Sequence, residues 1–276
     1  MAVGEWLSDA VACKGRRVVR LAWVTDPHLD HAGHGKTIDF AQKTAAVSDA
    51  CVITGDIGTA RTVVRLLEVF QRNYRKPICF VLGNHDFYGG EFASVARSVR
   101  KAFGCSYLDS GAVFRLTPGV DLCGVDGWYD ARFGSPETSS VQLNDWSEIQ
   151  DLRECVQSRT LIPALRLIGD HFHQKALETL ARATAKRVIF ATHVPPFAES
   201  STYNGKQSDA NWLPWFSCKA LGDALREWAE MNPEREIEVV CGHTHGRATF
   251  QPLPNLTVRT GFAEYGAPCV EMILDI

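Results

Sequence analysis

The stretch Ile78-Cys79-Phe80-Val81-Leu82-Gly83-Asn84-His85-Asp86 joins five apolar residues directly to a glycine and three polar residues. The apolar run predicts a buried strand that ends at position 82. The glycine lets the backbone turn sharply, so that an amide, an imidazole and a carboxylate can face one point. Taken alone, residues 83–86 fit an ordinary turn equally well. The interpretation therefore depends on whether the pattern recurs.

Four other apolar runs end in the same kind of side chain. The residues concerned are Asp26 and His28 after LAWVT, Asp56 after CVITG, His193 after VIFAT, and His243 and His245 after VVCG. Five independent turns would not be expected to carry metal-binding side chains so consistently. We therefore expect these strand ends to meet in one functional site.

The side chains in this set determine which metals suit it. Imidazole, carboxylate and carboxamide donors without a thiolate favour Mn²⁺, with Fe and Zn²⁺ as alternatives, and they argue against a cysteine-rich structural zinc site. Seven ligands are too many for one ion. They suit two ions about 3.5 to 4 Å apart with a shared carboxylate, an arrangement that can hold a phosphoryl group. The candidate ligands are Asp26, His28, Asp56, Asn84, His193, His243 and His245.

Composition limits the class of protein. The 276 residues have 45% hydrophobic and 22% charged residues and a net charge of −3, which is typical of a soluble globular chain. The acidic balance argues against binding along duplex DNA, and no apolar run is long enough to span a membrane. The nine cysteines form no CxxC pair. The first 17 residues lack the pattern of a secretory signal, so we expect a cytoplasmic protein.

The order of the expected elements indicates an α/β fold. After a short N-terminal helix, strands at 18–25, 50–54 and 78–82 alternate with helices at 36–47 and 59–73, the second capped by Thr59. Further helices are expected at 91–103, 145–155, 161–185 and 219–231, and further strands at 106–108, 113–116, 120–125, 187–191 and 237–241. The strands between 106 and 125 should pair locally in antiparallel fashion, and short edge strands should follow residue 246. No repeat or linker divides the chain, so residues 1–276 are expected to form one domain.

Two segments are candidates for contacts with a substrate. In the segment DGWYDAR at 126–132, Arg132 could contact a phosphate and Tyr129 could form a wall of the site; a surface loop with a packed Trp128 is an equal alternative. The loop 198–218 is long and aromatic, as expected for a lid or specificity loop. Its Trp212 could stack on a base or an aryl group, or could simply anchor the loop.

Other histidines are expected to lie outside the site. His31 and His34 fall in a polar, glycine-containing loop, and we expect them to be solvated. His171 and His173 are two residues apart on an expected helix, so they point to different faces and are interpreted as structural or surface groups.

The ordered motifs DPH, GDIG, GNHD, THVPP and GHTH resemble those of the calcineurin-like metallophosphoesterase superfamily. The resemblance extends from Asp26 to His245, and every ligand position of the family's motifs has the expected residue type in this sequence. It implies a sandwich of two mixed β-sheets flanked by α-helices. It also implies that Asp26, His28 and His245 hold a first metal, that Asn84, His193 and His243 hold a second, and that Asp56 bridges them. His85 would lie near the leaving oxygen, oriented by Asp86.

The expected activity follows from this resemblance. The chain would hydrolyse phosphodiesters, phosphomonoesters or both, with a hydroxide formed at the metals as nucleophile and His85 as general acid. Nucleotides are among the candidate phosphate esters, and we favour diesters. The alternative is a scaffold that keeps the fold and binds metal without catalysis. The presence of His85 and of all seven ligands argues against this alternative.

Overall fold

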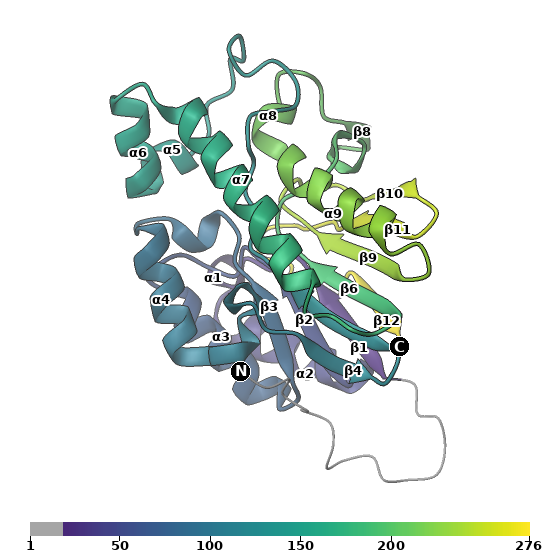
Figure 1. Cartoon of the computed structure of the whole chain (residues 1–276). Coiled ribbons are helices and arrows are strands. Elements are labelled where there is room, and N and C mark those ends of the chain that lie inside the picture. Colours follow the sequence, from purple (N-terminus) through teal and green to yellow (C-terminus); the bar gives the residue numbers. More distant parts are fainter. Residues whose placement is uncertain (1–18) are drawn as a thin grey trace.

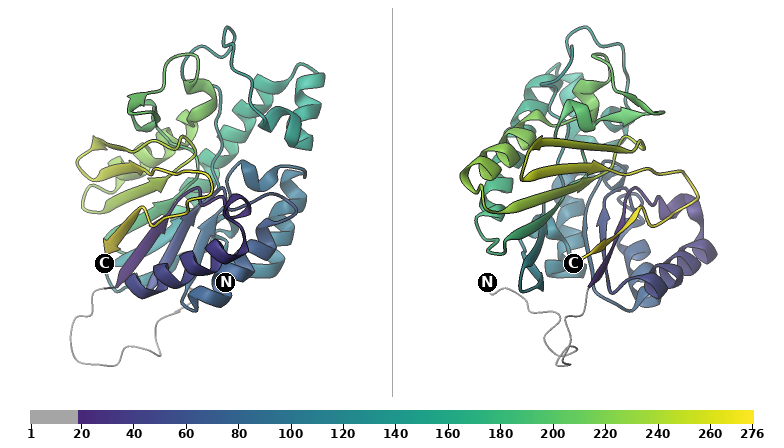
Figure 2. Two further views of the ribbon diagram at one scale, coloured as in Figure 1. Left: turned by 180° about the vertical axis from the view of Figure 1, so that it is seen from behind. Right: turned by 90° about the vertical axis from the view of Figure 1, so that its right-hand side faces the viewer.

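The computed structural model describes residues 19–276, so the short helix expected at the N-terminus lies outside the described residues. Two large β-sheets face each other, and helices cover the outer face of each (Figures 1 and 2). The sandwich of two mixed sheets flanked by helices that the sequence predicted is thereby confirmed. A third, two-stranded sheet is formed by β7 (Thr202–Tyr203) and β8 (Lys206–Gln207).

The first sheet has the strand order β12-β1-β2-β3. Three of its strands are parallel and alternate with helices along the chain, and the fourth is antiparallel to β1. The bounds are β1 (Arg20–Val24), β2 (Ala50–Thr54), β3 (Ile78–Val81) and β12 (Met272–Asp275). The outer face is covered by α2 (His34–Val47), α3 (Val63–Tyr74) and α4 (Phe92–Phe103). Helix α2, in purple, is seen to the right in the second view of Figure 2.

The second sheet has the order β10-β11-β9-β6-β5-β4. Its four inner strands are parallel, and the two edge strands are antiparallel to their neighbours. The bounds are β4 (Phe114–Thr117), β5 (Val120–Gly124), β6 (Arg187–Ala191), β9 (Glu236–Cys241), β10 (Ala248–Leu253) and β11 (Leu256–Thr260). The helices α7 (Leu161–Leu180) and α9 (Lys219–Met231) pack on each other and cover this sheet. The antiparallel pairing expected near residues 113–125 is confirmed by β4 and β5.

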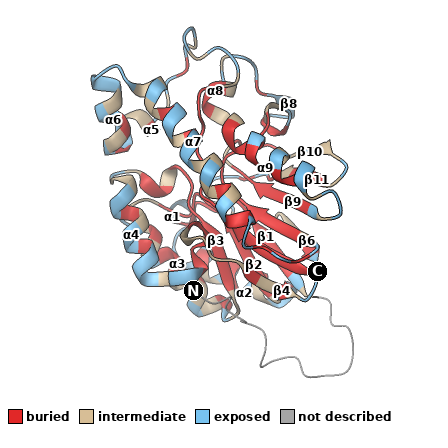
Figure 3. Ribbon diagram, viewed as in Figure 1, coloured by how far each residue is buried: buried red, intermediate tan, exposed pale blue. Residues whose placement is uncertain are grey.

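Alternate side chains of β1 enter two different parts of the core. Leu21 and Trp23 lie between the two sheets, while Ala22 and Val24 face the helices, and all four are buried. A strand covered on both faces must be apolar on both, which explains the nearly continuous hydrophobic run. Figure 3 shows the same burial in the other inner strands.

Two expected elements differ from the structure. The strand expected at 106–108 is wrong, because two short 3₁₀ turns, η2 (Gly104–Ser106) and η3 (Leu108–Ser110), fill this region and Tyr107 makes a single bridge to Phe80. The helix expected at 145–155 is two helices, α5 (Asp145–Glu148) and α6 (Gln150–Gln157). The break falls at Ile149, which has an extended backbone and a fully buried side chain.

Two helix boundaries also differ from prediction. The helix expected to run to residue 185 ends at Leu180, and the backbone N–H groups of Thr184 and Ala185 donate to the carboxylate of Asp121 instead. Thr59 does not cap α3, which begins at Val63. The N–H of Thr59 donates to the hydroxyl of Thr62, so residues 59–62 form a separate turn before the helix.

The loop expected at 198–218 contains short elements of its own. These are η4 (Ala198–Ser200), the β7–β8 hairpin and α8 (Leu213–Phe216). The hydroxyl of Thr260 donates to the carbonyl oxygen of Ser200 over 2.6 Å, which fixes the start of the loop to β11. Among residues 19–276, no helix combines the length and apolar character that a membrane crossing requires.

Candidate metal centre and active site

The loops that follow β1, β2, β6 and β9 are joined by direct hydrogen bonds. The backbone N–H of His28 donates to the carbonyl of Asp56 over 2.9 Å, and that of Gly242 donates to the carbonyl of His193 over 2.8 Å. Between the sheets, the N–H of His243 donates to Oδ1 of Asp26 over 2.9 Å. The carboxyl ends of strands from both sheets therefore meet at one edge of the sandwich.

The backbone at these strand ends is unusual. Nine non-glycine residues among positions 19–276 have positive φ angles, and five of them are predicted ligands: Asp26, His28, Asp56, His243 and His245. Their φ angles lie between 38° and 69°, in the left-handed region that such residues rarely adopt. Strained conformations of this kind persist where the surrounding structure holds them, and they cluster at functional sites.

Glycines beside the ligands make room for them. A Cβ atom on Gly83 would lie 2.2 Å from Oδ1 of Asp56, and one on Gly242 would lie 1.9 Å from Oδ2 of Asp26. No side chain fits at either place without moving a carboxylate. The glycines in the GNHD and GHTH motifs therefore let the two sheets bring their polar ends into contact.

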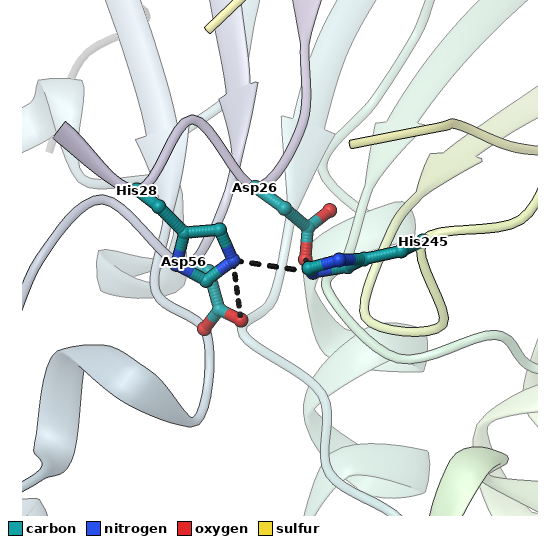
Figure 4. A group of neighbouring side chains, drawn as sticks. All are labelled: Asp26, His28, Asp56 and His245. Atoms are coloured by element: carbon teal, nitrogen blue, oxygen red, sulfur yellow. Dashed lines mark hydrogen bonds and ion pairs between the residues drawn. The ribbon is translucent and has the colours of Figure 1, made fainter. Parts of the chain in front are cut away.

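A first group of four side chains could hold a metal ion (Figure 4). It consists of Asp26, His28, Asp56 and His245, whose ligand atoms all lie within 4.8 Å of one another. Nε2 of His28 is 3.1 Å from Nε2 of His245 and 3.9 Å from Oδ2 of Asp56. Nδ1 of His28 is buried and has no hydrogen-bond partner in the described part of the chain.

A second group consists of Asn84, His193 and His243. Oδ1 of Asn84 lies 2.9 Å from Nε2 of His193 and 3.0 Å from Nδ1 of His243. The opposite nitrogen of each ring faces a carbonyl oxygen, that of Thr54 for His193 and that of Trp215 for His243. The proton of each neutral ring therefore points away from Asn84.

The side-chain amide of Asn84 has a fixed orientation. Its Nδ2 donates to Oδ1 of Asp145 over 2.8 Å, which fixes Oδ1 toward the two imidazoles. When both rings are neutral, the lone pairs of Oδ1 of Asn84, Nε2 of His193 and Nδ1 of His243 therefore converge within about 3 Å, with no hydrogen atom between them. A cation at this point would satisfy all three acceptors, so the donor set fits a metal ion.

Asp56 lies between the two groups. Its Oδ2 faces His28 at 3.9 Å, and its Oδ1 lies 3.5 Å from Nε2 of His193. The N–H of His85 donates to Oδ1 over 2.9 Å. One carboxylate thus directs one oxygen toward each group, as a bridging ligand must.

Burial dominates the electrostatics of these residues. It lowers the pKa of His28 to about 2 and that of His243 to about 4, so both rings are neutral and can act as ligands. Burial raises the pKa of Asp56 to about 7, with a further contribution from Asp26. Burial lowers the pKa of His193, but the carboxylates of Asp56 and Asp26 outweigh burial and raise that pKa above the usual value. A cation held by Nε2 of His193 would take the place of the proton there. A carboxylate-rich, buried site of this kind favours a bound cation.

His85 lies at the edge of the first group. Its ring stacks on Tyr88 with 4.4 Å between centroids and lies 4.8 Å from the ring of His28. Burial lowers its pKa, although the carboxylates of Asp145 and Asp86 oppose this effect. The ring is therefore close to the candidate metal centre without belonging to either ligand group.

Asp86 differs from the expectation that it orients His85. Its Oδ1 accepts the N–H groups of Ile57 and Gly58, and its Oδ2 accepts that of Gly83, at 2.8 to 2.9 Å. The carboxylate thus ties the loop after β2 to the loop after β3. Its contribution to the site is to hold these loops together.

Tyr129 and Arg132 are less accessible than we expected. Tyr129 is fully buried; its ring stacks on His243 at 6.1 Å and its hydroxyl donates to Oδ2 of Asp145 over 2.9 Å, so it supports the site from behind and forms no open wall. The guanidinium of Arg132 pairs with Asp130 at 3.2 Å and Asp170 at 2.7 Å, which links this loop to α7. Two carboxylates thus already occupy the group expected to bind phosphate.

Trp212 is 40% exposed and is separated from the second ligand group by Phe216. Its ring is 4.9 Å from that of Phe216, which in turn is 5.4 Å from His243.

The histidines interpreted as structural or surface groups lie on α7, where His171 is exposed and Nδ1 of His173 bonds to the carbonyl of Ala220 over 3.0 Å.

Three residues that contact predicted ligands were not predicted from the sequence: Asp145, Tyr88 and Tyr265. Asp145 is buried and accepts hydrogen bonds from Asn84, Tyr88 and Tyr129. It begins a short helix far along the chain, and no motif marks it. Tyr265 lies over His28 at 4.2 Å and also contacts His31, which we expected to be only solvated. Of the three, only Tyr88 could have been found from the sequence, because it lies two residues after the GNHD motif in the run GNHDFY.

Two solved structures with a similar fold are named as a hydrolase and as a dimetal phosphatase. A phosphopantetheinyl hydrolase from Mycobacterium tuberculosis aligns with a TM-score of 0.62 over 93% of this chain and 95% of its own, at 14% identity. A dimetal phosphatase from Danio rerio aligns with a TM-score of 0.51 over 92% and 90%, at 12% identity. At this identity the likeness concerns the fold. A comparison with curated protein sequences found no match.

A family model matches most of the chain. The model of the calcineurin-like phosphoesterase family matches residues 19–247, which include both ligand groups and most of both sheets. The ligand-type residues at the strand ends lie within this span, and four of them form the buried cluster around Asp56. The chain therefore belongs to the calcineurin-like phosphoesterase family and is a metal-dependent phosphoesterase.

Proposed function

We propose that the chain hydrolyses phosphodiesters, with activity on phosphomonoesters beside it, at a centre of two divalent metal ions. The observation that supports this most strongly is the position of Asp56, whose two carboxylate oxygens face different ligand groups at 3.9 and 3.5 Å. In this proposal Asp26, His28 and His245 hold one ion and Asn84, His193 and His243 hold the other. Mn²⁺ is the favoured metal, with Fe and Zn²⁺ as alternatives.

The bound ions would supply two things: a lower pKa for an attacking water and positive charge against the phosphoryl oxygens. The protein residues hold this arrangement rigid. The carbonyls of Thr54 and Trp215 fix the tautomers of His193 and His243, and Asp145 fixes the amide of Asn84. Fixed second partners of this kind keep ligands oriented and limit reorganisation during the reaction.

His85 is the proposed proton donor for the leaving oxygen. The ring is held by stacking on Tyr88, and it lies beside the first ligand group. Burial lowers the pKa of His85 in the free protein. A bound phosphate ester places negative charge near the ring and raises that pKa, so the protonated form is favoured when substrate is present.

The substrate is proposed to lie between the metal centre and the loop 198–218. The exposed ring of Trp212, backed by Phe216, gives this side an apolar surface beside His243. A planar or apolar ester group would stack there, and a nucleotide is one candidate. Arg132 has a weaker case as a phosphate contact because of its two carboxylate partners.

A substrate panel on metal-reconstituted protein tests this proposal. Nitrophenyl phosphate and bis-nitrophenyl phosphate, assayed with Mn²⁺, separate monoesterase from diesterase activity, and nucleotides and a phosphopantetheinyl ester extend the panel. Asp56→Asn should lose both ions in metal analysis, because the bridging carboxylate becomes a neutral amide. Two ions retained per chain in that variant would remove Asp56 from the bridge, and a wild-type protein with metal but no activity on any ester would favour the scaffold alternative.

A further inference from the structure

The segment after β11 places a tyrosine directly over the candidate metal centre. Tyr265 is 49% exposed, and its ring lies 4.2 Å from that of His28 and 5.3 Å from that of His245. Its hydroxyl is 3.5 Å from Nε2 of His85. The same side chain therefore covers two predicted ligands of the first ion and reaches the proposed proton donor.

The backbone around Tyr265 is held in place from both sides. The N–H of Ala267 donates to the carbonyl of Glu264 over 3.1 Å, which closes a turn with Tyr265 near its tip. Nζ of Lys36, on α2, donates to the carbonyl of Gly266 over 3.1 Å. Gly266 has a φ of +74°, which a residue with a side chain would rarely adopt.

The side chain has a lateral contact as well. The ring of His31, on α1 (Leu29–Ala32), packs edge-on against Tyr265 at 5.0 Å. Together with His28, this leaves the tyrosine ring between two imidazoles. The hydroxyl therefore points to a defined place at the mouth of the site.

We propose that Tyr265 is a substrate-binding residue whose hydroxyl donates, beside Nε2 of His85, to the ester oxygen that becomes the leaving group. This inference rests on the proposed function, because it assumes that His85 protonates that oxygen. Two donors 3.5 Å apart can both lie about 2.8 Å from one oxygen atom placed between them. A phenol near neutral pH keeps its proton, so it can donate to an oxygen that gains negative charge.

Tyr265→Phe is the variant that isolates the hydroxyl. The phenyl ring would still cover His28, so metal content and melting temperature should match those of the wild type. Turnover of an alkyl phosphate ester should fall about 10- to 100-fold, because a strongly basic leaving oxygen needs both donors. Turnover of the nitrophenyl ester of the same class should fall less than threefold, since nitrophenolate leaves without much help.

A double-mutant cycle with His85→Ala checks that both donors act on the same oxygen. If they do, the double variant should lose less than the product of the two single losses on the alkyl ester. Tyr74→Phe is the matched control. Its hydroxyl bonds to Ser48 over 2.9 Å at the start of β2, the end of the strand away from the site, and its kinetics should be unchanged.

The possible results separate this inference from the proposed function. An inactive wild-type protein with full metal content would reject the proposed function itself. An active wild type with an unchanged Tyr265→Phe variant would reject the role of the hydroxyl alone. Equal losses on alkyl and nitrophenyl esters would also overturn the inference, because they would place the hydroxyl on a phosphoryl oxygen that does not leave.

Discussion

Asp86 illustrates how a residue in a functional motif can serve the backbone. It is fully buried, and its two oxygens accept hydrogen bonds from three N–H groups in the loops that carry Asp56 and Asn84. These loops come from neighbouring parallel strands, β2 and β3. A buried N–H group that loses its acceptor costs about 1 to 3 kcal/mol, so the carboxylate at position 86 stabilises the site through its loops.

Asp86→Asn should therefore destabilise the protein by about 2 kcal/mol, because the new amide group turns a donor toward an N–H group. Asp86→Ala should cost more, since all three N–H groups lose their acceptor. Urea denaturation of the metal-loaded protein measures both. Asp39→Asn is the control: Asp39 pairs with Lys43 on the surface of α2, and its loss should change the free energy of unfolding by less than about 0.5 kcal/mol. An Asp86→Asn variant as stable as that control would contradict the role in joining the loops.

The predicted metal ligands could be found from local sequence, whereas the residues that support them could not. Asp26, His28, Asp56 and His245 each follow an apolar strand, and local sequence was sufficient to place them together. Asp145 and Tyr265 lie on a short helix and on a turn, and their neighbours along the chain carry no pattern. They reach the site only through tertiary packing, which single-sequence reasoning does not supply.

At the scale of elements, a row of charges joins three parallel strands of the second sheet. Glu238 on β9 bonds to Arg187 on β6 over 2.6 Å and to Arg259 on β11 over 2.7 Å. Burial alone would raise the pKa of Glu238, but the hydrogen bonds from the two arginines outweigh it and hold that pKa below its usual value. The carboxylate therefore stabilises the sheet in its charged form.

This lowered pKa predicts how stability depends on pH. A carboxylate with a lowered pKa in the folded state contributes stability above its unfolded pKa, about 4.3, and loses it as the pH falls through the folded pKa. Glu238→Gln should cost about 1 to 2 kcal/mol at pH 7, and the difference from wild type should shrink below about pH 4. Thermal unfolding at several pH values measures this. The control Glu68→Gln removes an exposed pair with Arg72 and should have little effect at any pH; a constant difference for Glu238→Gln would contradict the assignment.

The helices and strands that the sequence predicted well are those with long, regular patterns. The strands at 50–54 and 187–191 and the helix at 219–231 have the expected bounds. The errors fall where a buried polar group or a single bulky side chain determines the backbone conformation. After α7, the N–H groups of Thr184 and Ala185 donate to Asp121 on β5. Between α5 and α6, the buried Ile149 has an extended backbone. Such decisions depend on residues distant in the sequence.

For the whole molecule, the metal centre joins the two sheets. Asp26, His28, Asp56 and Asn84 come from the first sheet, whereas His193, His243 and His245 come from the second. Without a cation, the acceptors of Asn84, His193 and His243 face one another at about 3 Å across this boundary. Metal binding should therefore stabilise the packing of one sheet on the other.

Removal of the metals by a chelator should lower the melting temperature. One ion at 100 times its dissociation constant stabilises the folded state by about 2.7 kcal/mol, which corresponds to roughly 5 to 10 °C in a chain of this size. Adding Mn²⁺ back should restore the original temperature in wild type. Asp56→Asn should respond much less to either treatment, and equal melting temperatures with and without metal would contradict a cation between the sheets.

The strand β12 has a consequence for how the chain folds during its synthesis. Arg20 pairs with Asp275 and Trp23 with Met272, so the edge of the first sheet joins residues about 250 positions apart. A nascent chain on the ribosome can form β1, β2 and β3 early, but β1 keeps an open edge until residue 275 has left the exit tunnel. During that interval the exposed edge of β1 can pair with another chain.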